Sequence, residues 1–327
     1  MRLPLAWLRD YLACELGSDA LAERLVMLGF PVESIERRPP LRGVVAGRLR
    51  EVVPHPNADR LRVCTVDIGA AKSLTIATAA DNVAAGDLVP VATLGAELAG
   101  GLAIGARTMR GIASEGMLVS IEELGLAAAG FENGILHLDE DLPLGCDLVS
   151  HYRLNDDVLE VEIGANRVDA MSVLGLAREL AAALGLPLRM PETWEAADAR
   201  ALNSDALVRL ESADCRRFVA QRFGGIVVRP APLGLRLRLA LAGQRPLDGV
   251  VDVTNFVMLE CAQPLHAYDL AQIAGGRVVV RDARAGERLR TLDGEERALD
   301  PSVLAIADDD GPLAIAGIVG GERSSVG

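Results

Sequence analysis

The sequence predicts an α+β protein of several domains, in which a small β-barrel interrupts a split α/β domain and a further α/β region follows. Three observations predict this class. Residues 44–126 hold short strand patterns separated by glycine turns, which is typical of a small closed barrel. The helix and strand patterns on either side of this stretch span about 40 residues each, too few to fold alone. A further set of strand and helix patterns begins near Leu207.

The barrel stretch opens with a strand whose apolar residues lie between Val44 and Val52. Pro54 and Pro56 remove two backbone donors, so we expect a loop at residues 55–59. The next run alternates polar and apolar residues with a period of two, which places Arg60 and Arg62 on one strand face and Leu61 and Val63 on the other. Further short strands are expected at residues 74–77, 88–92 and 117–120, with glycine turns at Gly100, Gly101, Gly105 and Gly111.

The fragments that flank the barrel each predict one helix and one strand. Before the barrel, Ser18 and Asp19 can cap a helix that ends at Gly29, because leucines recur at helical spacing between them. An extended segment at residues 30–35 follows. After the barrel, the predicted elements are a strand at residues 158–163 and a helix at residues 173–184 that Gly185 and Pro187 end. The two fragments therefore make sense as halves of one domain.

The region after a charged linker at residues 191–204 predicts a second α/β arrangement. Its expected elements are strands at residues 208–211, 217–223 and 226–228, a helix at 233–242 ended by Gly243, and a strand beginning at Val250, Val251 and Val253. Thr254 and Asn255 can then cap an apolar helical run at residues 256–259, which Gln263 and Pro264 end before His266. A polar pair and a histidine on either side of a short helix could converge on one pocket.

Composition and charge exclude several classes of protein. No apolar run approaches the length of about 18 residues that crosses a membrane, and Arg9 and Asp10 interrupt the apolar N-terminus, so no signal peptide is predicted. The five cysteines are widely spaced and without a CxxC pair, which favours reduced thiols over a zinc site or disulfides. The net charge is −13, and residues 44–126 hold seven basic and nine acidic side chains. A stand-alone nucleic-acid binder normally has a basic stripe, so RNA binding here would need further surfaces.

The motifs of the barrel resemble a known family. HPNADRLRVCTVDIG, RGIASEGM and EELGL are similar to the tRNA-binding OB domains found in cytokine-like tRNA-binding proteins and in several aminoacyl-tRNA synthetases. The resemblance implies an OB-fold barrel at residues 43–148 that contacts tRNA. The tRNA-binding residues that it implies are Arg60, Arg62, Arg107, Arg110, His55, Asn57 and Ser114.

The remaining motifs extend the resemblance over nearly the whole chain. LEVEIGANRVDAMSVLGLAREL, VDVTNFVMLE, QPLHAYDL and DGPLAIAGIVGGERSSV resemble, in this order, the bacterial phenylalanyl-tRNA synthetase beta subunit. The resemblance implies a split N-terminal domain at residues 1–42 and 149–195, and an incomplete editing domain of the B3/B4 type at residues 196–327. The family's later glutamate and its Thr-Asp-Ala-Ser-His-Arg segment have no counterpart before Gly327, so it implies the N-terminal portion of a longer subunit.

The resemblance also implies a site that hydrolyses mischarged tyrosyl-tRNA(Phe). A pocket shaped for phenylalanine cannot strongly reject a side chain that only adds a hydroxyl group, so a second, hydrolytic site is needed. Such a site needs a positioned water and a donor for the developing oxyanion. The editing residues that the resemblance implies are His266, Asn255, Thr254, Arg245 and Gly317.

Structural roles also fit some of these residues. On chemistry alone, His266 fits a packed or capping histidine, and Gly317, Gly320 and Gly321 fit tight turns. Asn166, Arg167 and Asp169 similarly fit either a functional cluster or a loop cap with a salt bridge.

The partners and cofactors follow from the same resemblance. It implies binding to tRNA(Phe) and to a catalytic alpha subunit in a cytoplasmic heterotetramer of two alpha and two beta subunits. The chain itself is expected to hold no metal or cofactor, whereas the complete ligase uses ATP and Mg²⁺, and no P-loop or dinucleotide motif is present. Two other functions stay open: a stand-alone tRNA-binding module, and a structural subunit without editing activity.

Overall fold

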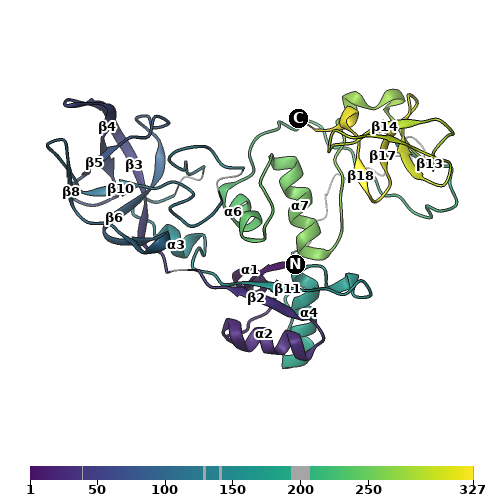
Figure 1. Ribbon diagram of the computed structural model, residues 1–327, viewed down its shortest axis with the longest axis horizontal. Helices are drawn as coiled ribbons and strands as arrows, with labels where there is room; N and C mark the ends of the chain where they lie inside the picture. The colour runs from purple at the N-terminus through teal and green to yellow at the C-terminus, as the bar shows by residue number, and fades with distance from the viewer. Residues whose placement is uncertain (39, 128–129, 140–141, 193–206, 327) are drawn as a thin grey trace. The chain divides into compact units, whose positions relative to one another are not determined.

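The computed structural model describes residues 1–38, 40–127, 130–139, 142–192 and 207–326 (Figure 1). Contacts divide the chain into two compact units. The first unit comprises Met1–Met190 and Pro230–Gln263, and the second comprises Pro191–Arg229 and Pro264–Gly327. The expected boundary between residues 195 and 196 lies outside the described residues, as does the expected linker beyond Glu192.

A three-stranded antiparallel sheet in the first unit joins segments from both sides of the barrel. Its order is β1 (Arg2–Pro4), β11 (Val158–Val161) and β2 (Val32–Glu36). Leu159 pairs with Leu3 on one side and with Ile35 on the other. The central strand therefore comes from after the barrel stretch and both edge strands from before it. The helices packed on this sheet are α1 (Leu5–Tyr11), α2 (Ser18–Met27) and α4 (Val173–Leu184), and their buried side chains include Trp7, Leu21, Leu25, Leu176 and Leu180.

The observed caps of two of these helices, α4 and α2, agree only partly with the caps that the sequence predicts. Helix α4 begins and ends where the sequence predicts: the Ser172 hydroxyl accepts a hydrogen bond from the Gly175 amide at 2.9 Å, and Gly185 has a φ of 65°. The predicted cap of α2 by Ser18 and Asp19 is wrong. Gly17 is the N-cap, and it accepts the first helical hydrogen bond through its backbone carbonyl. The extended backbone at Gly17 starts the helix one residue early, so Ser18 is already inside it.

The barrel stretch forms a curled six-stranded sheet in the first unit. Its main path runs β10 (Gly116–Leu118), β6 (Leu88–Leu98), β3 (Arg42–His55), β4 (Ala58–Asp67) and β5 (Leu74–Thr78), and β7 (Leu102–Ala103) pairs with β6. The Glu115 amide donates a hydrogen bond to the Thr75 carbonyl at 2.8 Å, so the β10 end of the sheet meets β5. Val66 and Ile76 are fully buried inside the curl. The hairpin β8 (Arg107–Met109) and β9 (Ile112–Ser114) and the short helix α3 (Leu148–His151) complete the stretch.

The element ends in this stretch differ from the predicted ones. The expected loop at residues 55–59 is a two-residue turn, because the ladder between β3 and β4 continues through Pro54, which pairs with Arg62. The register of the ladder shifts between Pro54 and His55, directly before the turn. Strand β6 runs to Leu98, beyond the predicted end at Ala92, since it also pairs with β7.

Residues 230–263 form two helices of the first unit, α6 (Leu233–Leu241) and α7 (Gly249–Cys261). The strand predicted from Val250 to Val253 is wrong, and so is a cap at Thr254 and Asn255, because all of these residues lie within α7. The Asp248 carboxylate accepts hydrogen bonds from two amides of the first turn and caps the helix. Trp7 and Phe256 stack with ring centroids 4.9 Å apart. Capping and packing thus outweigh the low helix propensity of valine, which costs a few tenths of a kcal/mol per residue.

The second unit contains a five-stranded sheet. Its order is β12 (Val208–Leu210), β13 (Val278–Asp282), β16 (Leu304–Ala307), β17 (Pro312–Ile315) and β18 (Val319–Gly320), and only the first pair is parallel. Between β13 and β16 in the sequence, β14 (Arg288–Arg290) and β15 (Glu296–Ala298) pair as a separate hairpin. The short helical turns of the described residues are η1 (Ala99–Gly101), η2 (Val168–Ala170), η3 (Leu270–Gln272), η4 (Ala274–Gly276) and η5 (Glu322–Ser324).

Two strands predicted in this part of the chain are wrong. Residues 217–223 and 226–228 form no ladder with any part of the chain that the structure describes. Val219 and Val227 are 76% and 78% exposed. A strand needs a neighbouring strand to satisfy its backbone, and strand-type sequence alone does not supply one.

Candidate nucleic-acid interface and candidate hydrolytic site

Two turns of the barrel sheet are held together by side chains that the sequence singled out. The buried His55 ring accepts a hydrogen bond from the Asn57 amide at Nδ1, at 3.1 Å, and therefore donates from Nε2 to the Met109 carbonyl, at 3.0 Å. The Asn57 side chain donates to the Arg110 carbonyl at 3.4 Å. Arg110 and Gly111 have φ values of 48° and 95°, so the hairpin tip is a tight turn. His55 and Asn57 thus fix the tip of the β8–β9 hairpin against the β3–β4 turn.

Ser114 has a structural position in the same region. Its side chain is buried, and its hydroxyl accepts from the Ala77 amide at 3.1 Å and donates to the Gly116 carbonyl at 3.0 Å. These two bonds tie β9 to β5 and β10. The hydroxyl hydrogen is therefore committed within the barrel.

Four arginines lie at or near these turns, and they differ in ion pairing from other basic residues of the barrel stretch. Arg60 and Arg62 follow the β3–β4 turn on β4, and Arg107 and Arg110 lie on the hairpin. None of the four makes an ion pair with a residue that the structure describes. The ion-paired cations of the sheet include Arg42 with Glu97, Arg50 with Asp67 at 2.6 Å, and Lys72 with Glu115 at 3.1 Å. Positive charge without a local acidic partner is thus concentrated around the two turns.

The face of β4 that carries Arg60 and Arg62 also carries Cys64 and Val66, because side chains two apart share a face. Cys64 and Val66 are fully buried in the barrel core. Arg60 is exposed and Arg62 is half-buried. This strand therefore continues beyond the end of the core, where its inward-facing positions become accessible to solvent.

Three of the five predicted editing residues belong to the first unit. Arg245 is exposed and precedes the buried Pro246 in the loop before α7. Thr254 and the half-buried Asn255 lie on α7, where the Thr254 hydroxyl donates to the Val251 carbonyl one turn back at 2.7 Å. Neither Arg245 nor Asn255 has a side-chain hydrogen bond to a described residue, which leaves their donors available to a ligand.

His266 and Gly317 belong to the second unit. The His266 ring meets the Tyr268 ring edge-on with centroids 4.5 Å apart. A β-carbon at Gly320 would lie 2.4 Å from Cε1 of His266, so only glycine lets the imidazole pack there. Gly317 has a φ of 69° in the turn between β17 and β18, a conformation that favours glycine.

The surroundings of His266 favour its neutral form. Burial lowers the pKa of His266 and raises the pKa of Tyr268 to about 12. The residue as a whole is nevertheless exposed to solvent. At neutral pH the ring is therefore a neutral acceptor that can orient or deprotonate a water.

The cluster of Asn166, Arg167 and Asp169 is explained by an ion-pair network. Arg167 donates to Asp169 at 2.8 Å and to Glu179 of α4 at 2.7 Å, and it lies over the Phe30 ring. Ser172, and not this cluster, caps the helix. Two residues near the predicted site escaped the sequence analysis: Tyr268, and Asp252, a fully buried acid whose only sequence signal is its place in an apolar run.

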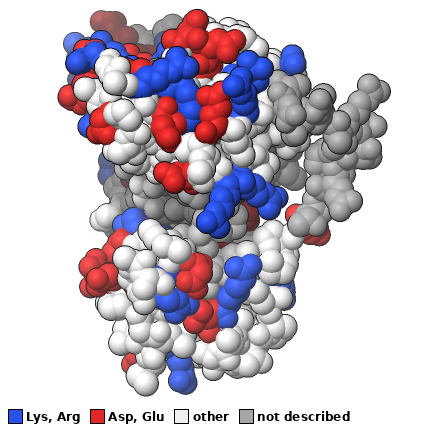
Figure 2. All heavy atoms as spheres, turned by 90° about the vertical axis from the view of Figure 1, so that its right-hand side faces the viewer, with Lys and Arg blue, Asp and Glu red and all other residues white. Residues whose placement is uncertain are grey.

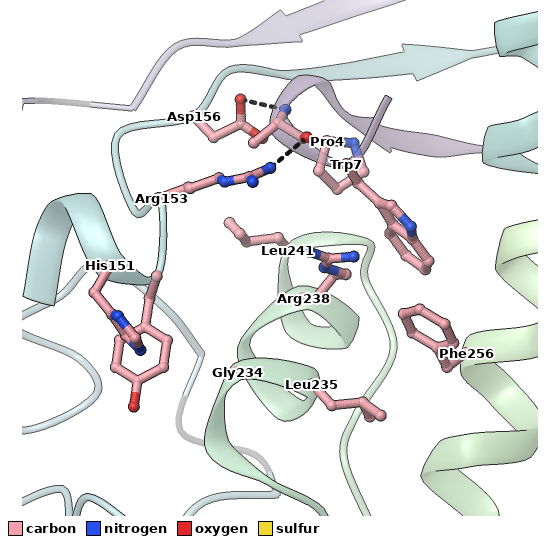
Figure 3. Close-up of a pocket in the computed structure, with 12 residues that line it drawn as sticks. Pro4, Trp7, His151, Arg153, Asp156, Gly234, Leu235, Arg238, Leu241 and Phe256 are labelled. Carbon is pink, nitrogen blue, oxygen red and sulfur yellow. Dashed lines mark hydrogen bonds between the residues drawn. The ribbon is translucent and has the colours of Figure 1, made fainter. Parts of the chain in front are cut away.

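A cavity of about 390 Å³ opens in the first unit near α1, α6 and the segment after α3 (Figure 3). Arg238 lies over the Trp7 and Phe256 rings and pairs with Asp10 at 3.0 Å. Asp156 accepts hydrogen bonds from the Ala6 amide, and burial raises its pKa to about 6. None of the predicted site residues lines this cavity.

The charges of the molecular surface are mixed. Figure 2 shows basic and acidic side chains interspersed on the face that it displays, with no large area of one sign. Exposed ion pairs of the second unit include Arg288 with Glu296 and Arg297 with Asp293. Among the described residues, no helix is long and apolar enough to cross a membrane.

Comparisons with known families match two parts of the chain. Residues 44–147 match the family described as "Putative tRNA binding domain". Residues 214–327 match the family described as "B3/4 domain".

Three curated relatives that are similar over the whole chain have the name phenylalanine–tRNA ligase beta subunit. The relative from Moorella thermoacetica is 43% identical over 332 residues, which cover 100% of this chain and 41% of that protein. Those from Symbiobacterium thermophilum and Gloeobacter violaceus are 44% and 46% identical, again over 100% of this chain and over 37% and 42% of theirs. The chain thus spans about two fifths of the length of these relatives.

Proposed function

Because the chain belongs to the family of phenylalanine–tRNA ligase beta subunits, we propose that it binds tRNA(Phe) and contributes to hydrolysis of mischarged tyrosyl-tRNA(Phe). The observation that carries the proposal is the similarity over 100% of the chain, with the tRNA-binding match preceding the B3/4 match. The activation of phenylalanine belongs in this proposal to an alpha subunit, with which the complete protein forms a cytoplasmic heterotetramer of two alpha and two beta subunits. ATP and Mg²⁺ serve that complete ligase.

The proposed domain organisation is an OB-fold barrel at residues 43–148 inserted into a split domain of residues 1–42 and 149–195. The three-stranded sheet supports this organisation. Strand β11 pairs with β1 and β2, although the strands of the curled sheet lie between β2 and β11 in the sequence. Residues 196–327 form the B3/B4-like part of the proposal. The match of residues 214–327 supports this assignment.

The proposed tRNA contact is the group of four arginines around the two barrel turns. Arginine binds phosphate oxygens through paired N–H donors, and this contact does not depend on base sequence. His55 and Asn57 hold the hairpin tip in place, so they position Arg107 and Arg110 rather than bind phosphate with their own ring and amide groups. Ser114 shapes the barrel in the same way.

The proposed hydrolytic residues belong to both units, and a role is proposed for each residue by itself. The neutral His266 orients or deprotonates the water that attacks the ester carbonyl. Arg245 and Asn255 supply side-chain donors to the aminoacylated end of the tRNA, and the turn at Gly317 lets backbone approach it closely. Thr254 uses its hydroxyl hydrogen within α7, so its contribution is to the shape of the helix surface.

The tRNA contact is tested by a salt titration of tRNA(Phe) binding to the complete enzyme. The double variant Arg107→Ala/Arg110→Ala should bind more weakly, and the slope of log K against log salt should fall by roughly 0.7 to 0.9 for each phosphate that is no longer neutralised. The matched control is Arg42→Ala/Arg50→Ala, which changes the net charge equally but removes arginines that acidic neighbours already neutralise. Equal slopes for the two double variants would place the tRNA interface elsewhere.

A further inference from the structure

Asp252 is an ionisable side chain with no role in the chemistry described above. It lies in the first turn of α7 and is fully buried. Its Oδ1 atom accepts a hydrogen bond from the Leu247 amide at 2.8 Å. Its Oδ2 atom is buried without a hydrogen-bond partner among the described residues. A buried carboxylate with one unsatisfied oxygen destabilises a fold, and an apolar side chain would avoid that cost.

The one side-chain hydrogen bond that Asp252 makes with a described residue closes the loop that carries Arg245. Leu247 is 57% exposed, so its amide is held by the carboxylate and not by packing of its side chain. Asp248, the next residue, is the N-cap of α7, and its carboxylate accepts hydrogen bonds from the amides of Val250 and Val251. Two carboxylates therefore fold the loop back onto the start of α7.

The same loop also contacts Gly130, which lies in the sequence between β10 and α3. A β-carbon at Gly130 would lie 2.3 Å from the Pro246 carbonyl oxygen, so the two backbones are in close contact. Pro246 is buried while Arg245 before it is exposed. The backbone is thus held at Pro246 and at Leu247, directly after the exposed Arg245.

We propose that Asp252 is a positioning residue, which holds the Arg245–Asp248 loop so that the Arg245 guanidinium is presented to the aminoacylated end of the tRNA. The inference rests on the proposed function, because it needs Arg245 to contact that substrate. It assigns no contact with the substrate to Asp252 itself. The carboxylate serves only as an acceptor, so asparagine, whose side-chain oxygen can accept the same bond, should replace it.

The test is the deacylation of purified tyrosyl-tRNA(Phe) by the complete enzyme, with kcat and KM measured separately. Asp252→Leu removes the acceptor and should raise KM by about fivefold, the effect of removing one hydrogen bond. Asp252→Asn should stay within about twofold of the unaltered enzyme. Phenylalanine charging should not change in either variant, which also shows that each is folded and assembled. If the leucine variant does not assemble, Asp252→Ala takes its place.

A double-mutant cycle with Arg245→Ala separates positioning from a general structural role. If Asp252 acts through Arg245, Asp252→Leu should have almost no further effect on KM once Arg245 is alanine. The same fold-change in both backgrounds, or a loss of activity in Asp252→Asn, would overturn the inference.

Failure of the inference is distinct from failure of the proposed function. Slower deacylation in Arg245→Ala with an unchanged KM in Asp252→Leu overturns the inference alone. Unchanged deacylation in both Arg245→Ala and His266→Ala overturns the proposed function with it.

Discussion

His266 is the titratable side chain on which the proposed hydrolysis depends, and its surroundings set the pH range in which it works. The ring packs against Gly320 and Tyr268, which removes part of its hydration. Loss of hydration disfavours the charged imidazolium, so the pKa of His266 lies below the ordinary value of about 6.5. The lowered pKa therefore favours the neutral base at neutral pH, and the base is lost as the pH falls.

The pH dependence of deacylation should therefore show an acid limb that His266 controls. We expect kcat/KM for tyrosyl-tRNA(Phe) to fall below a midpoint that lies under about pH 6.5, the ordinary histidine value. A pH series with the complete enzyme measures this midpoint. A midpoint at or above pH 7, or an unchanged limb in His266→Ala, would show that another group is the base.

At the residue scale, the sequence did not reveal the hydrogen bonds that its predicted site residues make. It selected Ser114 and Thr254 as site residues, yet both hydroxyl hydrogens are committed within the fold. Hydrogen-bond partners far apart in sequence decide this, and no local pattern reveals them. It also left Asp252 out, because a single acid in an apolar run gives no sign of the loop amide that it binds.

The sequence predicted the start of α4 correctly but missed the caps of α2 and α7. Ser172 caps α4 through its hydroxyl, whereas α2 begins at Gly17 and leaves Ser18 within the helix. The first part of α7 was predicted as a strand because it is rich in valine, and only residues 256–259 were predicted as a helix, although Asp248 caps the whole of α7. Residues 217–228 have strand-type sequence but no ladder partner among the described residues, and a sequence pattern does not identify a partner.

The two serines give a matched test of this difference. Ser172→Ala should lower the free energy of unfolding by about 1 kcal/mol, because the Gly175 amide loses its acceptor. Ser18→Ala should change it by less than about 0.5 kcal/mol, since the Ser18 side chain makes no capping bond. Urea unfolding of the two variants, followed by far-UV circular dichroism, measures both. Equal losses would mean that the Ser172 hydroxyl is not what stabilises the start of α4.

At the scale of the whole chain, the sequence predicted that segments on both sides of the barrel stretch belong together, and the three-stranded sheet joins them. It did not predict that residues 230–263 group with the first unit. That grouping depends on contacts such as the Trp7–Phe256 stack and the bond from Tyr11 to Glu260, which join residues more than 200 apart. Arg245 and Asn255 thus belong to one unit and His266 to the other.

The central claim is that this chain supplies the hydrolytic residue that clears tyrosine from tRNA(Phe), and the most direct measurement is deacylation of purified tyrosyl-tRNA(Phe). The complete enzyme should hydrolyse it, and His266→Ala should slow hydrolysis by about 100-fold or more, the usual contribution of a general base. His151→Ala, a histidine of the first unit, should hydrolyse at the unaltered rate, and all three enzymes should charge phenylalanine equally. Hydrolysis by His266→Ala at the unaltered rate would contradict the account and leave His266 with a packing role only.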